Sequence, residues 1–196
     1  IMKRLLLIVL LLSVGFSQQL AKVVETYENG NIKSITSHKE TRNRIEKVKE
    51  VKYHENGQKQ YEGTFKNGEQ DGLFAEWYEN GQKKYEWNYK DGKKDGLTTK
   101  WHENGQKDYE WNYKDGELDG LTTKWYENGQ KKIEGTYKDG KLDGLKTDWY
   151  ENGQMSFKGI FKNGELDGLS TQWFENGQKE NEGTFKDGEL VNIIGR

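Results

Sequence analysis

The sequence predicts an all-β protein, an elongated single-layer antiparallel meander of repeated β-hairpins. Three observations predict this fold class. A 24-residue unit recurs six times from His54 onward without insertion or deletion, each unit carries two hairpin-turn signals, and polar and apolar residues alternate between the turns. We therefore divide the chain into a signal peptide over residues 1–17, a cap over 18–53 made of a degenerate repeat and a charged insert, and six repeats over 54–196, the last being a terminal cap.

The composition argues against a conventional thick core, because only 31% of the residues are hydrophobic while 33% are charged. Aromatic residues make up 13% of the chain, and there are 24 glycines and no proline. Many tight turns joined by uninterrupted strands fit these numbers. We expect whatever is buried to be mostly aromatic.

The N-terminal segment has the pattern of a secretory signal peptide. Lys3 and Arg4 precede the apolar run Leu5 to Leu12, and Gly15-Phe16-Ser17 suits cleavage near Ser17. Eight apolar residues fall short of the ~20 that span a bilayer. We expect export to the periplasm, cell envelope or exterior, and the absence of cysteine excludes disulfides and a lipid anchor on cysteine.

Each unit is expected to form one hairpin and the connection to the next. Asn80-Gly81 and Asp91-Gly92 are turn signals, because both central residues tolerate positive φ. Residues 85–90 and 97–101 alternate aromatic or apolar with polar side chains, which predicts half-buried strands. Gly96, between Asp95 and Leu97, indicates a β-bulge or a close backbone approach.

A single hairpin is marginal in water, so stacked units should line their apolar side chains into one continuous row. Loss of one buried tryptophan from that row should cost about 3–5 kcal/mol. The predicted row contains Trp77, Trp101, Trp125, Trp149 and Trp173, flanked by Phe65, Tyr89, Tyr113, Tyr137, Phe161 and Phe185 and by Leu73, Leu97, Leu121, Leu145 and Leu169.

The two ends depart from the repeat. Residues 27–34 are a degenerate copy, and the charged insert 38–52 fits either a long hairpin or a short helix. The last unit has Val191-Asn192-Ile193 where the others have Asp-Gly-Leu, as expected of a terminal cap.

The segments Tyr-Glu-Gly-Thr-Phe-Lys-Asn-Gly at 61–68 and Asp-Gly-Leu at 71–73 resemble the MORN repeat. The Glu-Asn-Gly-Gln-Lys segment is similar to the bacterial variant found in YwqK-type antitoxins of toxin–antitoxin systems. The resemblance implies a scaffold, a dimerisation platform or a membrane-associated adaptor. Trp87 and Trp111 stand where the family pattern has a glycine, as at Gly63, which places bulky side chains at a crowded position.

We expect no catalytic residues and no cofactor. The chain has three histidines and no cysteine, no arrangement of nucleophile and base stands out, and nearly all the carboxylates occupy positions that recur from unit to unit. Active sites are seldom copied six times.

Pairs of Asp or Asn residues near the turns have two explanations, metal binding and turn chemistry. Paired oxygen ligands four residues apart beside glycines suit a hard cation, but Asp and Asn also favour turns, and nearby lysines repel cations. We favour turn chemistry and expect no metal. The pairs are Asp91 and Asp95, Asp115 and Asp119, Asp139 and Asp143, and Asn163 and Asp167.

The residue after each tryptophan of the row should face the opposite side of its strand, which would form an outer aromatic stripe. With the two extra tryptophans, this stripe is the candidate binding surface, because contiguous exposed aromatic area marks binding faces. The alternative is that both faces pack between neighbouring hairpins. The candidate residues are Tyr78, Trp87, His102, Trp111, Tyr126, Tyr150 and Phe174.

The net charge and its distribution limit the classes of partner that the chain can bind. Without residues 1–17 the chain has 29 basic and 33 acidic residues, a net charge of −4, and both signs are mixed throughout. Neither nucleic acid nor lipid headgroups would find a concentrated basic surface. We expect an exported non-enzymatic scaffold that binds a protein partner or a second copy of itself. The alternative is a module that binds carbohydrate, such as cell-envelope polysaccharide, through its repeated aromatics.

Overall fold

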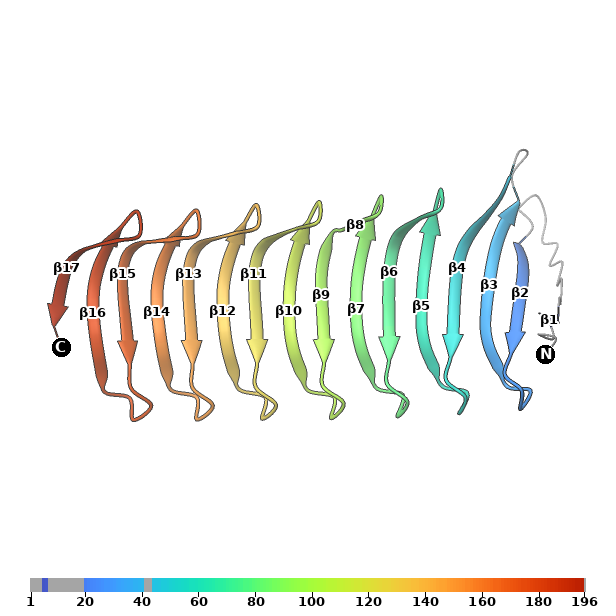
Figure 1. Cartoon of the computed structure of the whole chain (residues 1–196), viewed down its shortest axis with the longest axis horizontal. Helices are drawn as coiled ribbons and strands as arrows, with labels where there is room; N and C mark the ends of the chain where they lie inside the picture. Colours follow the sequence, from blue (N-terminus) through green and yellow to red (C-terminus); the bar gives the residue numbers. More distant parts are fainter. Residues whose placement is uncertain (1–4, 7–19, 41–43, 196) are drawn as a thin grey trace. The chain divides into compact units, whose positions relative to one another are not determined.

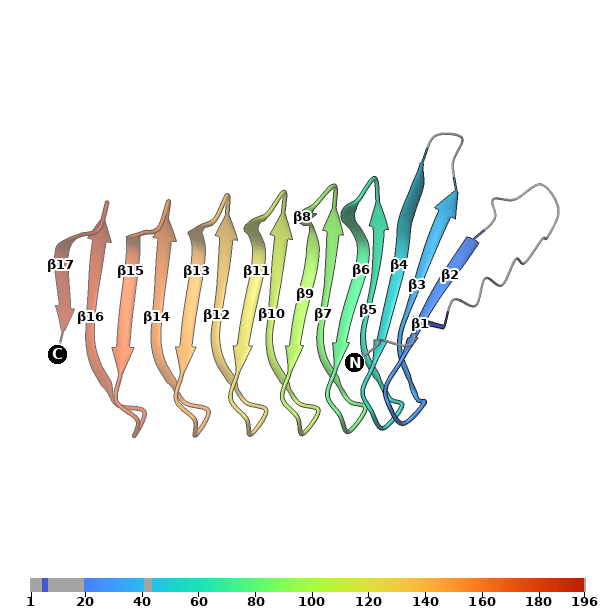
Figure 2. The same cartoon turned by 45° about the vertical axis from the view of Figure 1, so that its right-hand side comes forward.

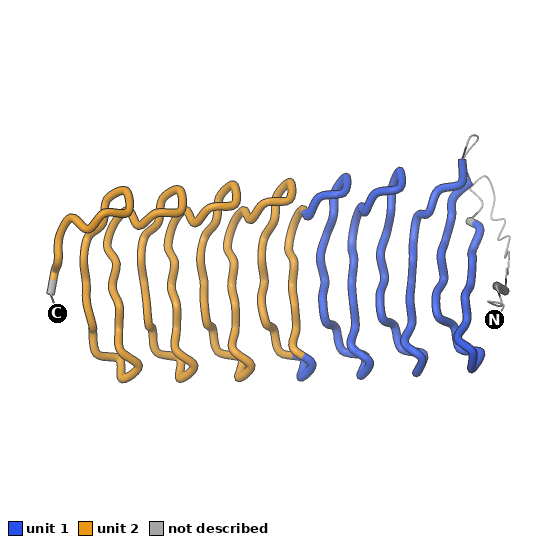
Figure 3. The backbone as a smooth tube through the Cα atoms, in the orientation of Figure 1, with its two compact units in different colours: residues 1–94, 103–105 blue, residues 95–102, 106–196 orange. Residues whose placement is uncertain are grey.

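The computed structural model describes residues 5–6, 20–40 and 44–195, which fall into two compact units. Unit 1 contains residues 1–94 and 103–105, and unit 2 contains residues 95–102 and 106–196 (Figure 3). Apart from Leu5 and Leu6, the predicted signal peptide and its cleavage site lie outside the described residues.

In unit 1 each strand pairs antiparallel with the next along the chain (Figure 1). The strands are β1 (Leu5–Leu6), β2 (Leu20–Thr26), β3 (Ile32–Glu40), β4 (Ile45–Tyr53), β5 (Lys59–Lys66), β6 (Glu69–Trp77), β7 (Lys83–Lys90) and β8 (Lys93–Lys94).

Unit 2 continues the same pattern, and Figure 2 shows its successive strands running side by side in opposite directions. Its strands are β9 (Gly96–Trp101), β10 (Lys107–Lys114), β11 (Glu117–Trp125), β12 (Lys131–Lys138), β13 (Lys141–Trp149), β14 (Met155–Lys162), β15 (Glu165–Trp173), β16 (Lys179–Lys186) and β17 (Glu189–Gly195). No helix occurs among the described residues of either unit, and the predicted all-β meander of hairpins is confirmed.

The charged insert forms strands. Residues 38–40 of the insert belong to β3 and residues 45–52 to β4, and the two strands pair antiparallel from Ser34 opposite Lys52 to Glu40 opposite Ile45. Of the two conformations that the sequence left open, the structure has the hairpin.

The two turn signals of each unit build different turns. At Asp91-Gly92 both residues have positive φ (46° and 77°), as predicted for a tight hairpin turn. At Asn80-Gly81 only the glycine does (85°), so the prediction is wrong for the asparagine. The side chain explains the difference, because Asn80 Oδ1 accepts a hydrogen bond from the backbone N of Gln82 (2.9 Å) and closes a local turn.

The glycine before each leucine lies in a β-bulge, as the sequence predicts. Trp111 is opposite Thr122 and Tyr113 is opposite Leu118, so Asn112 faces three residues of β11. Gly120 at the centre of these three has a φ of 105°. The bulge adds two residues to β11 and therefore keeps its alternation, so Leu121 lies on the other face from Leu118 and Thr122, which are opposite Tyr113 and Trp111.

The predicted row of tryptophans, rings and leucines is wrong in one respect, because the register places the leucines on the other face from the Tyr and Phe rings. Leu73 is opposite Asn88, and the adjacent Phe74 is opposite Trp87. Directly opposite residues share a face of an antiparallel sheet, so Leu73 and Phe74 point to opposite sides. We call the two sides the leucine face and the aromatic face. The leucines are exposed, at 49% for Leu73, 42% for Leu97, 50% for Leu121, 46% for Leu145 and 44% for Leu169.

The buried apolar side chains of the described part are few, as expected from the composition. Phe74 is fully buried on the aromatic face of unit 1, and Ala75 beside it is 4% exposed. The Phe74 ring lies 5.5 Å from Phe65, 5.2 Å from Tyr89 and 6.3 Å from Trp87 between centroids. This aromatic cluster is the centre of the apolar packing in unit 1.

Candidate interaction surfaces

The aromatic residues that follow the strand-end tryptophans tie one repeat to the next. In unit 2, Tyr126 Oη donates a hydrogen bond to the carbonyl oxygen of Trp149 (2.7 Å), and Tyr150 Oη donates to that of Trp173 (2.8 Å). Burial raises the pKa of the Tyr126 hydroxyl, which keeps it protonated as a donor. These two candidate residues therefore have a structural contact.

The other strand-end candidates are arranged differently. The ammonium of Lys84 lies 5.6 Å from the ring centroid of Tyr78, and His102 Nε2 lies 3.9 Å from Asp108 Oδ1. Only Phe174 is exposed, at 47%, whereas the rest of this row is half-buried. A binding role for the row stays a prediction.

Trp87 and Trp111 lie in the middle of their strands, apart from the strand-end row. In unit 1 the Trp87 ring stacks on Phe74 at 18°. In unit 2 the Trp111 ring stacks on Tyr109, with 4.1 Å between centroids and 16° between planes. The predicted candidate surface thus divides into two mid-strand tryptophans and a strand-end row.

The position occupied by these tryptophans is crowded where a glycine stands, as predicted. A Cβ built on the buried Gly63 would lie 2.4 Å from the Phe74 ring. Trp111 fits because small threonines face it on both sides, Thr98 on β9 and Thr122 on β11.

The paired acidic residues serve the turns, as the sequence analysis favoured. Asp115 has a φ of 51° in its turn, and its backbone N donates to Asp95 Oδ2 of the preceding repeat (3.4 Å). The backbone N of Asn163 donates to Asp143 Oδ2 in the same way (3.2 Å). Within the described ranges, no three His, Cys, Asp or Glu residues are grouped so that they could hold a metal ion.

A second ladder of side chains joins the turns at the other ends of the strands, where Asn128 and Asn152 lie. Asn128 Oδ1 accepts from the backbone N of Gln130 (2.9 Å), and its Nδ2 donates to the carbonyl oxygen of Glu151 in the next repeat (3.0 Å). Asn152 bonds Gln154 and Glu175 in the same way. Asn128 and Asn152 thus each shape their own turn and hold the next one.

The leucine face of unit 2 carries an exposed apolar row that the sequence analysis did not recognise. Leu97, Leu121, Leu145 and Leu169 occupy equivalent positions on alternate strands, and Ile160 (45% exposed) lies directly opposite Leu145. Strands are about 4.8 Å apart, so successive leucines are separated by about 9.6 Å. The signal in the sequence was the leucine after each Asp-Gly, which counting through the two-residue turn places on the other face from the Tyr and Phe rings.

Unit 2 also has shallow depressions beside its strand-end tryptophans. One of about 340 Å³ is lined by Gln106, Lys107, Trp125 and Gly129. Another of about 290 Å³ is lined by the residues 24 positions later, Gln130, Lys131, Trp149 and Gly153. Sequence reasoning missed this group, although a Gln-Lys pair precedes a tryptophan by 18 residues in each case.

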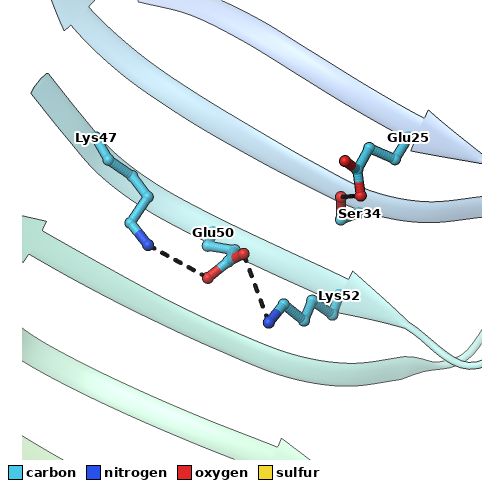
Figure 4. Close-up of polar contacts among 5 residues, drawn as sticks. All are labelled: Glu25, Ser34, Lys47, Glu50 and Lys52. Carbon is cyan, nitrogen blue, oxygen red and sulfur yellow. Dashed lines mark hydrogen bonds and ion pairs between the residues drawn. The ribbon is translucent and has the colours of Figure 1, made fainter. Parts of the chain in front are cut away.

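Ion pairs on the surface join neighbouring residues of opposite sign. In unit 1, Glu50 on β4 lies 3.5 Å from Lys47 Nζ and 3.6 Å from Lys52 Nζ, while Ser34 Oγ donates to Glu25 (3.1 Å) (Figure 4). These exposed pairs neutralise local charge and add little stability each.

The described residues contain no helix of the length and apolarity needed to cross a membrane. Antiparallel hairpins repeated at a fixed period, with side-chain ladders between repeats, define the class of β-hairpin repeat proteins. A family model described as MORN repeat variant matches six segments, at residues 48–67, 70–91, 94–115, 118–139, 142–163 and 166–187. The chain therefore belongs to this MORN repeat family, which makes it a repeat protein consistent with an interaction scaffold. A search of curated proteins found no match.

Proposed function

We propose that the chain is an exported, non-enzymatic scaffold that associates with a second copy of itself through the leucine face of unit 2. The exposed row of Leu97, Leu121, Leu145 and Leu169 is the observation that carries this proposal. Regular exposed apolar rows of this kind mark interaction sites.

A second copy suits the row better than an unrelated partner. Its own row has the same spacing, so the leucines of two facing copies can interdigitate along their whole length. The charges nearby are paired within each chain, as in Lys107 with Glu110 (2.5 Å) and Lys131 with Glu134. Two copies therefore meet without strong like-charge repulsion.

Export and the absence of catalysis rest on the sequence. Lys3, Arg4 and the apolar run before Ser17 support export. Nearly all the carboxylates recur at equivalent positions in several repeats, which supports a structural task for them. Expression in a secretion-competent bacterium followed by N-terminal sequencing checks export: we expect a mature chain that starts at Gln18, and an intact N-terminus would contradict it.

Light scattering coupled to size-exclusion chromatography tests self-association. We expect the chain to form a dimer and the double variant Leu121→Ser/Leu145→Ser to be a monomer with an unchanged far-ultraviolet CD spectrum. Leu190→Ser is the matched control, since Leu190 is 52% exposed but lies outside the row, against Gly183. A monomeric parent chain, or a double variant that remains dimeric, would overturn the proposal.

A further inference from the structure

We propose that the depressions beside Trp125 and Trp149 are successive subsites for an extended, neutral β-1,4-linked polysaccharide. This inference is independent of the self-association proposed above. It rests on four residue types that recur together at a 24-residue interval in unit 2.

Each depression offers one flat apolar wall. Trp125 and Trp149 are half-buried at the ends of β11 and β13, so part of each indole stays open to solvent. The apolar C–H face of a pyranose ring packs well against such a flat aromatic surface. A sugar is also small enough for depressions of about 290 and 340 Å³.

Polar groups surround the indole. Lys107 Nζ lies 5.5 Å from the Trp125 ring centroid, and Lys131 Nζ lies 5.7 Å from that of Trp149. Each lysine is paired with the glutamate three residues on, so the site has donors and acceptors but little net charge. That combination suits the hydroxyl groups of a neutral sugar better than a carboxylate or phosphate ligand.

A glycine keeps each depression open. A Cβ built on Gly153 would lie 2.6 Å from Oε1 of Gln130, and one on Gly129 would lie 3.4 Å from Oε1 of Gln106. Both glycines also have a φ near 85°, which disfavours any other residue. The glutamine amide therefore lies against bare backbone and can exchange hydrogen bonds with a ligand.

The spacing selects an extended chain. The two depressions are two strands apart, or about 9.6 Å. A β-1,4-linked chain repeats every second sugar at close to this length, and alternate rings present the same face. One chain laid across the strands can therefore fill both subsites, and the second contact becomes intramolecular.

The repeat that follows departs from this pattern. Met155 stands at the position of Lys107 and Lys131, before Trp173. The tryptophan there lacks the ammonium donor, so the subsites at Trp125 and Trp149 do not continue to Trp173.

Isothermal titration of the full chain with cellohexaose tests the proposal, with cellobiose and the α-linked maltohexaose as ligand controls. We expect cellohexaose to bind more tightly than cellobiose, because it spans both subsites, and maltohexaose not to bind. The variant Gln130→Ala/Lys131→Ala changes exposed side chains and leaves both tryptophans in place. It should weaken cellohexaose binding by about tenfold.

Gln178→Ala is the matched control, because it removes the same side chain from the equivalent turn outside both depressions. It should leave binding unchanged. Quenching or a shift of tryptophan fluorescence on titration should accompany binding. No binding of cellohexaose, equal binding of maltohexaose, or the same loss in the control variant would each overturn the proposal, whereas loss of the dimer alone would not.

Discussion

At the scale of single residues, neighbours in the chain differ sharply in what they contribute. Phe74 is fully buried among four aromatic rings, whereas Leu73 is 49% exposed. Simple alternation along β6 sets this difference, because Gln70 is opposite Phe65 and Phe74 is opposite Gly63, which leaves Leu73 on the other face.

We therefore predict opposite results for two adjacent alanine substitutions. Phe74→Ala should lower the free energy of unfolding by about 3–5 kcal/mol, because it empties a closed aromatic cluster. Leu73→Ala should change it by no more than about 0.5 kcal/mol. Urea unfolding followed by CD measures both, and similar losses for the two variants would show that the register is wrong.

The hydroxyl of Tyr61, a member of this cluster, makes the stability of the folded state depend on pH. Burial, and then the charge of Glu50, raise the pKa of the Tyr61 hydroxyl from 10.0 to about 12. The unfolded chain releases this proton first as pH rises above 10, so the folded state holds more protons between pH 10 and about 12. Stability must fall across that window.

The corresponding prediction concerns alkaline unfolding. The melting temperature should drop between pH 10 and 12, and Tyr61→Phe should make that drop shallower because no proton is lost at this position. A parallel decline in the two proteins would mean that other groups cause it. Tyr126→Phe is a second test, because burial raises the pKa of the Tyr126 hydroxyl as well: it should also make the drop shallower, and it should lower stability at neutral pH by removing the hydrogen bond to Trp149.

At the scale of elements, the asparagine ladder explains how one hairpin fixes the next. Asn128 makes one contact within its own turn and one to Glu151, so its two functions can be separated. Asn176, at the equivalent position of a later turn, instead directs its Nδ2 to Gln178 Oε1 (3.4 Å).

Substitutions at these positions should separate the two contacts. Asn128→Ala should cost about 1–2 kcal/mol, and Asn128→Asp, which keeps the acceptor within the turn but loses the donor to the next repeat, about 1 kcal/mol. Asn176→Ala should cost less than Asn128→Ala. Chemical denaturation ranks the three variants, and a cost for Asn176→Ala equal to that of Asn128→Ala would remove the inter-repeat bond from the explanation.

Most strands and turns could be predicted from the sequence, because they depend on local patterns. Residues 85–90 and 97–101 alternate visibly, and Asp91-Gly92 makes the expected turn. The face of the leucines could also be predicted, since counting back through the two-residue turn at Asp91-Gly92 places Leu97 opposite Glu86, on the other face from Trp87 and Tyr89. The insert gave no decision, because its charged residues alternate poorly.

The candidate surfaces were harder to predict, because they depend on contacts between repeats. The hydroxyl groups of Tyr126 and Tyr150 reach carbonyl groups 23 residues away, and no local pattern shows such a contact. The tryptophans were recognised as important but were expected to be buried. Because Trp125 and Trp149 are only half-buried, removal of either should cost less than the 3–5 kcal/mol expected for a fully buried ring.

At the scale of the whole molecule, the strict 24-residue period is itself a structural requirement. Within each unit, a repeat contacts its neighbours through the sheet and through side-chain ladders at the strand ends, so stability should be nearly a sum of repeat and interface contributions. A deletion that preserves the period should remove one contribution, whereas a deletion that breaks it should put side chains on the wrong faces.

Two deletions in unit 2 that differ by one residue test this. Removal of residues 122–145 joins Leu121 to Lys146 and preserves the period, so the protein should fold cooperatively, with a denaturant m-value about 12% lower in proportion to the residues lost. Removal of residues 122–144 leaves one extra residue after Leu121, which inverts the faces of the strand that follows and should abolish cooperative unfolding or promote aggregation. The measurement is urea unfolding followed in parallel by CD and tryptophan fluorescence. Equal stability of the two deletion variants would show that the repeats tolerate a change of phase, and the additive description of the array would then have to be abandoned.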